Sequence, residues 1–153
     1  MPISFHFNHE AKLMICVHTG SVMDKEFFVD YKSMLESDLF TTDMNLLIDL
    51  SQTDSSSRSG DILRQLAEYV KIKLSEASTY PKVAVVAPKD ISFGFARMYE
   101  FLADSIPWDF VVFRSADTAL AWLRVPEDLM DDLERKTRQV ISPDNKDTDS
   151  DVS

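Results

Sequence analysis

Apolar and polar side chains alternate at every second position near the start of the chain. This spacing covers residues 3–7, and a second run follows in which Leu13, Ile15 and Val17 alternate with Met14, Cys16 and His18. A period of two is typical of a half-buried β-strand. The polar pair His9 and Glu10 lies between the two runs, so the pattern predicts an antiparallel hairpin.

After Gly20 the apolar spacing becomes that of an amphipathic helix. Ser21 is a suitable N-cap, and Asp24 falls in the first turn, where an acidic group complements free N–H groups. Ser115 precedes the last predicted helix in the same way, and the third helix is expected to start near residues 90–92. The predicted inward faces of the four helices are Phe27, Phe28, Tyr31, Met34 and Leu35; Ile62, Leu63, Leu66, Val70 and Leu74; Phe95, Met98 and Leu102; and Ala116, Ala119, Leu120 and Leu123.

Three further segments, residues 44–50, 83–87 and 110–113, are almost continuously apolar. Such runs indicate strands that are buried on both faces, as in parallel sheets. The element order is therefore β-β-α-β-α-β-α-β-α. It predicts an α/β fold with a single mixed, mostly parallel five-stranded sheet, right-handed crossovers and an antiparallel N-terminal hairpin at its edge.

The composition changes near Pro126, which divides the chain into three predicted segments. Residues 1–124 form the α/β domain, and residues 125–141 form an appended amphipathic acidic helix in which Pro126 suits the first helical position. Residues 142–153 are polar and acidic without aromatic side chains, and we expect them to be a disordered tail.

Charge and cysteine content exclude several classes of partner. The net charge of −10 argues against nucleic acids and anionic membrane surfaces, which require clustered Lys and Arg. The single cysteine, Cys16, cannot form an intramolecular disulfide, and no apolar run is long enough to span a membrane. The N-terminus does not resemble a secretion signal, so a cytoplasmic location is predicted.

No catalytic constellation is apparent in the sequence. His6, His9 and His18 all fall in the hairpin, away from the strand ends where a triad would form, and Cys16 lies mid-strand. The chain has only three glycines and no glycine-rich phosphate loop. We therefore predict a protein that is not an enzyme and binds neither a metal nor a cofactor.

Two segments lie where α/β sheets place ligands, beyond the carboxyl ends of strands. The first is residues 51–60, where five serines and a threonine precede a helix whose N–H groups favour an anion. It is read either as a flexible loop with a helix cap or as a docking loop. Its candidate binding residues are Ser51, Ser55, Arg58, Ser59 and Gly60.

The second segment is residues 92–98, at the start of the third helix. Gly94 is unfavourable within a helix by about 1 kcal/mol relative to alanine, which suggests that something packs closely there. Close helix–sheet packing is the favoured explanation, and a ligand or partner is the alternative. The candidate residues are Phe93, Gly94 and Arg97, whose guanidinium could pair with an acid or an anion.

Both segments resemble the STAS family, which has the fold of bacterial anti-sigma-factor antagonists. That family's signature is approximately D-L-S-x-V-x-x-[IM]-D-S-S-G, and residues 49–60 read D-L-S-Q-T-D-S-S-S-R-S-G. The serine that antagonists present for phosphorylation falls on Arg58. Residues 93–98 and 119–123 are similar to a divergent, uncharacterised bacterial branch of this SpoIIAA-like fold.

The resemblance covers residues 3–124 and implies a non-catalytic, regulatory protein–protein interaction module. The alternative is a carrier or sensor of a small lipophilic ligand, because aromatic residues are numerous enough to line a pocket. A deep apolar cavity would favour the carrier, and a filled core with an exposed apolar patch would favour the module. The protein partner, the ligand and the oligomeric state stay open, with a homodimer among the alternatives.

Overall fold

The structure is a computed structural model that describes residues 2–126. The predicted helix at residues 125–141 lies outside this range from residue 127 onward, and the predicted tail at residues 142–153 lies wholly outside it.

Five strands and four helices alternate along the described chain as predicted. In order they are β1 (Ile3–Asn8), β2 (Leu13–Ser21), α1 (Asp24–Glu36), β3 (Asn45–Asp54), α2 (Gly60–Lys73), β4 (Lys82–Val86), α3 (Asp90–Leu102), β5 (Asp109–Phe113) and α4 (Ala116–Trp122).

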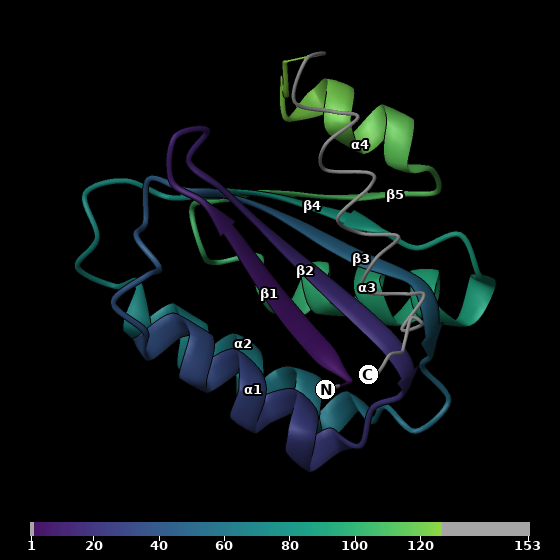
Figure 1. Cartoon of the computed structure of the whole chain (residues 1–153). Helices are drawn as coiled ribbons and strands as arrows, with labels where there is room; N and C mark the ends of the chain where they lie inside the picture. Colours follow the sequence, from purple (N-terminus) through teal and green to yellow (C-terminus); the bar gives the residue numbers. More distant parts are fainter. Residues whose placement is uncertain (1, 127–153) are drawn as a thin grey trace, which may run out of the picture.

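The sheet has the order β1-β2-β3-β4-β5, so strands that follow one another in the chain are neighbours in space. β1 and β2 are antiparallel, and all other neighbours are parallel. Each crossover moves in the same direction, and right-handed connections then place α1, α2 and α3 on one face of the sheet. α4 lies on the opposite face (Figure 1). The predicted fold class is confirmed.

Two hydrophobic clusters fill the space on either side of the sheet. The larger packs α1, α2 and α3 on the sheet, and the smaller lies under α4. β2 contributes to both, since Met14 and Cys16 belong to the larger cluster and Leu13 and Ile15 to the smaller. This strand is therefore buried on both faces. It is internal to the sheet, whereas β1 forms the edge of the hairpin.

The predicted cap at Ser21 is wrong. Ser21 is still part of β2 and pairs with Asp54 of β3, so the strand runs past Gly20. The N-cap of α1 is Met23, whose backbone N–H donates to the Glu26 carboxylate at 3.2 Å. Polar residues at the C-terminal ends of β2 and β3 continue the pairing between the two strands. Their polarity had suggested instead that the strands end earlier.

The predicted inward face of α3 is right for Phe95 and Leu102, which pack against the core, and wrong for Met98. Ser92, Ala96 and Tyr99 are its buried residues, whereas Met98 is exposed. Ser92 is fully buried because its hydroxyl is hydrogen-bonded to that of Ser55 at 2.7 Å. Hydrophobic periodicity does not detect a buried polar residue whose partner is distant in the sequence, which is why Ser92 was not predicted to face inward.

Candidate functional site

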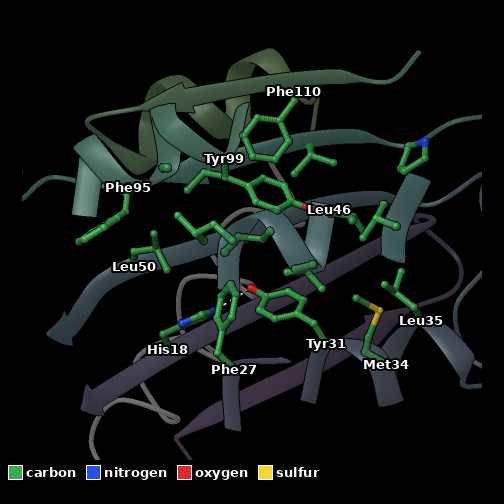
Figure 2. A pocket seen from close by; sticks show the side chains of 18 of the residues that line it. His18, Phe27, Tyr31, Met34, Leu35, Leu46, Leu50, Phe95, Tyr99 and Phe110 are labelled. Atoms are coloured by element: carbon green, nitrogen blue, oxygen red, sulfur yellow. Dashed lines mark hydrogen bonds between the residues drawn. The ribbon is translucent and has the colours of Figure 1, made fainter. Parts of the chain in front are cut away.

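A cavity of about 100 Å³ lies between the sheet and the layer of helices formed by α1, α2 and α3. Figure 2 shows aromatic and aliphatic side chains from these helices and from β3 and β5 around it. Apolar residues make up most of its wall. They include Phe27, Met34, Leu35, Leu46, Leu50, Leu66, Val83, Phe95, Ala96, Trp108 and Phe110.

A chain of hydrogen bonds stands at one side of this cavity. The Tyr31 hydroxyl lies 2.7 Å from His18 Nε2 and 3.3 Å from Cys16 Sγ. His18 and Tyr31 line the cavity, and Cys16 lies behind them with no exposed surface. The ring of Phe27 packs on Tyr31, with a centroid separation of 5.1 Å. Figure 2 shows the bonded pair His18 and Tyr31 beside Phe27.

Burial keeps these groups uncharged. Together with the positive charge of Arg58, it lowers the pKa of His18 to about 3. Burial also raises the pKa of Cys16 to about 12 and holds the pKa of Tyr31 well above its ordinary value. At neutral pH this side of the cavity is therefore polar but carries no charge of its own. A protonated, inaccessible thiol is also a poor nucleophile.

Arg58 is buried at the same side and is fixed from three directions. Its guanidinium donates to Asp24 Oδ1 at 2.7 Å and to the Val22 carbonyl at 2.9 Å, and it lies 4.3 Å from the centre of the Phe27 ring. Only 6% of its side chain is exposed. The residue at the position of the family's phosphorylated serine is thus a buried cation that joins α1 to the start of α2.

The other predicted residues of this segment have local structural roles. Ser59 caps α2 by accepting from the Ile62 N–H, and its hydroxyl donates to Asp24 Oδ2 at 2.7 Å. Ser55 lines the cavity, Gly60 begins α2, and Ser51 lies within β3. Ser55 and Arg58 thus lie at the cavity, and the Asp24 carboxylate accepts hydrogen bonds from both Arg58 and Ser59. The predicted helix cap is confirmed at Ser59, and the first four residues of the segment belong to β3, so the loop is shorter than the predicted residues 51–60.

The candidate binding residues predicted on α3 are Phe93, Gly94 and Arg97, and none of them lines the cavity. Arg97 is 61% exposed and pairs with Glu100 one turn on, at 3.0 Å. Phe93 packs beneath the guanidinium of Arg114, 3.9 Å from the ring centre. A Cβ built at Gly94 meets no atom within 4 Å. The explanation of Gly94 by close packing is therefore wrong.

Gly94→Ala should leave the protein as stable as before or raise its free energy of unfolding by up to ~1 kcal/mol, because alanine is the better helix former. Gly20→Ala is the matched control, since its Cβ would also meet open space but its φ is +66°. That backbone conformation should cost alanine about 1 kcal/mol. Urea unfolding of both variants measures the difference. Equal losses at the two positions would mean that α3 is crowded at Gly94.

Two residues at the cavity, His18 and Tyr99, were missed by the sequence analysis as functional candidates. A signal for His18 was present, because it shares a face of β2 with Met14 and Cys16. A histidine that continues an apolar face must either be exposed or bonded to a partner. The partner, Tyr31, could not be identified before the packing of α1 on β2 was known.

An apolar stripe lies on the exposed side of α3. Ile91, Met98 and Phe101 are 49%, 42% and 79% exposed. Their spacing of seven and three residues places them on one side of the helix. This stripe is separate from the cavity wall, to which α3 contributes Phe95, Ala96 and Tyr99.

Residues 2–126 contain no cluster of three or more His, Cys, Asp or Glu side chains that could hold a metal ion. The helices in this part of the chain are all too short or too polar to cross a lipid bilayer.

Comparison with known proteins shows similarity at the level of fold. No protein-family model matches the chain, and a search of curated proteins finds no match. Among solved structures, the chain is similar to an uncharacterised protein of the DUF3478 family with a SpoIIAA-like fold, from Shewanella loihica PV-4. The identity is 17%, the match covers 79% of this chain and 91% of that one, and the TM-score is 0.47.

Proposed function

We propose that this protein binds a small, mainly apolar ligand in the cavity between the sheet and α1, α2 and α3, as its carrier or sensor. The observation that carries the proposal is the cavity of about 100 Å³, lined by apolar side chains with a few polar groups at one side. Protein interiors are close-packed, and voids larger than a water molecule are few. A concave apolar site with a few polar groups is the usual form of a ligand pocket.

The apolar wall of the cavity supports this proposal. A ligand that fills the cavity recovers dispersion contacts with the wall. The neutral state of Cys16, His18 and Tyr31 favours binding over acid–base or nucleophilic chemistry, and we propose that the protein is not an enzyme.

Titration with cyclopentane tests the cavity directly. We expect saturable binding, with shifts in NMR methyl signals confined to lining residues such as Leu46, Leu66 and Val83. Ala96→Leu should abolish the binding, because the larger side chain fills the cavity from α3. Ala121→Leu, on the exposed face of α4, is the matched control and should bind as before. Equal binding by both variants, or none by the unmodified protein, would contradict the proposal.

A second candidate function, a regulatory protein–protein interaction module, is favoured by the exposed stripe of Ile91, Met98 and Phe101. Purification from the native host followed by mass spectrometry separates the two candidates, because it reports proteins and small molecules together. A stoichiometric protein partner that is lost on Phe101→Ser would support the module. A retained small molecule that is lost on Ala96→Leu would support the carrier.

A further inference from the structure

The hydroxyl of Tyr99 is an unused hydrogen-bonding group at the cavity. Tyr99 is 9% exposed and lines the cavity, and its ring packs against Phe110 and Trp108 at centroid separations of 5.6 and 6.4 Å. Within residues 2–126 its hydroxyl makes no hydrogen bond to the protein. Buried tyrosine hydroxyls usually have a partner, and a ligand in the cavity can supply one for Tyr99.

Tyr31 provides the contrast within the same cavity. Its hydroxyl is bonded to both His18 and Cys16, so its principal hydrogen-bonding capacity is occupied. Both tyrosines line the cavity from helices, Tyr31 from α1 and Tyr99 from α3 (Figure 2). Burial raises the pKa of Tyr99, so its hydroxyl stays protonated and can donate. Of the two, Tyr99 is therefore the one with a proton to offer a ligand.

The charges at the cavity indicate that the ligand is neutral. Among residues 2–126, Arg58 is the only side chain in the wall with a permanent charge, and Asp24 already pairs with it at 2.7 Å. A charged ligand would lose its hydration without gaining a free counter-ion. A neutral oxygen that accepts from Tyr99 has no such cost.

We propose that the ligand is a compact apolar molecule with one uncharged acceptor, such as a carbonyl oxygen, that accepts a hydrogen bond from the Tyr99 hydroxyl. This inference rests on the proposed function and names the chemical class of the ligand. The rest of the wall, including Leu46, Val83 and Trp108, suits a hydrocarbon body.

Cyclopentanone and cyclopentane test the proposal as a matched pair, because they share a ring and differ by the carbonyl oxygen. Tyr99→Phe should weaken cyclopentanone binding roughly fivefold, as expected for one neutral hydrogen bond. It should leave cyclopentane binding unchanged. It should also leave the melting temperature unchanged or higher, since the removed hydroxyl has no bond to lose. Calorimetric or NMR titration gives the dissociation constants.

Two controls separate the outcomes. Tyr31→Phe should lower the melting temperature, because His18 and Cys16 lose their partner. Cyclopentanecarboxylate tests whether the cavity prefers a charged ligand. If this anion binds more tightly than cyclopentanone, the proposal that the ligand is neutral is wrong. If Tyr99→Phe weakens neither probe, or both equally, the role of Tyr99 is wrong while the cavity site stands. If neither probe binds the unmodified protein, the proposed function fails and this inference with it.

Discussion

Asp24→Ala should lower the free energy of unfolding by about 2–3 kcal/mol, a large loss for a carboxylate that is one-third exposed. The substitution leaves the guanidinium of Arg58 buried without its counter-ion, and removing one partner of a fully buried pair costs roughly 3–5 kcal/mol. The exposure of Asp24 reduces that figure, because water can partly replace the carboxylate. The Ser59 hydroxyl loses an acceptor as well. Urea unfolding measures the effect.

Asp61→Ala is the matched control for this prediction. Asp61 also pairs with an arginine, Arg64, but both side chains are more than half exposed. Such pairs contribute little, so we expect a loss of less than about 0.5 kcal/mol. The double variant Asp24→Leu/Arg58→Met should recover much of the stability, because it removes both charges together. If Asp24→Ala lowers the free energy of unfolding as little as Asp61→Ala does, water alone can satisfy the Arg58 guanidinium.

Acid should destabilise the protein through His18. In the folded state its pKa is lowered to about 3, whereas in the unfolded chain it is near the ordinary 6.5. Below pH 6.5 His18 is protonated in the unfolded chain but stays neutral in the folded protein. The free energy of unfolding therefore falls as the pH falls towards 3. Between about pH 6.5 and pH 4.5 this amounts to about 2–3 kcal/mol, and above pH 7 the contribution is constant. Burial is the main cause and Arg58 the second, while Tyr31 and Cys16 stay uncharged.

Urea unfolding between pH 7 and pH 4.5 isolates this contribution as a difference in slope. His18→Gln removes the titrating group, so its free energy of unfolding should depend less steeply on pH than that of the unmodified protein. Carboxylates elsewhere titrate in both proteins and cancel. His9→Gln, in the exposed turn between β1 and β2, should keep the original slope. The same slope in His18→Gln would mean that His18 accepts its proton in the folded state.

Local patterns predicted the elements of this fold because each strand and helix carries its own periodicity. The hairpin followed from alternation, and the three parallel strands followed from continuous apolar runs. Boundaries were less accurate where polar residues join the ladder. Ser51 and Thr53 were read as loop residues, but both belong to β3, and Thr53 is held against β2 by a hydrogen bond to the Gly20 carbonyl.

The candidate site was only partly predictable, because its residues come from separate elements. Arg58 and Ser55 were identified from a linear motif, and the structure places both at the cavity. The partner of Arg58 is Asp24, which the sequence suggested only as a helix-end charge. A cavity forms where packed surfaces do not fit completely, and no sequence pattern marks it. The roles of Tyr31 and Tyr99 could therefore be identified only from the structure.

The agreement between strand order and chain order has a consequence for how the protein folds. Each parallel strand pairs with the one before it, so every pairing closes a segment of only a few tens of residues, at a modest entropic cost. Formation of the sheet need not wait for the C-terminal strand. Each strand–helix unit can dock on the preceding one as it leaves the ribosome, starting from the hairpin. The cavity wall is complete only when α3 and β5 have been added, so a ligand can stabilise only the last stage of this sequence.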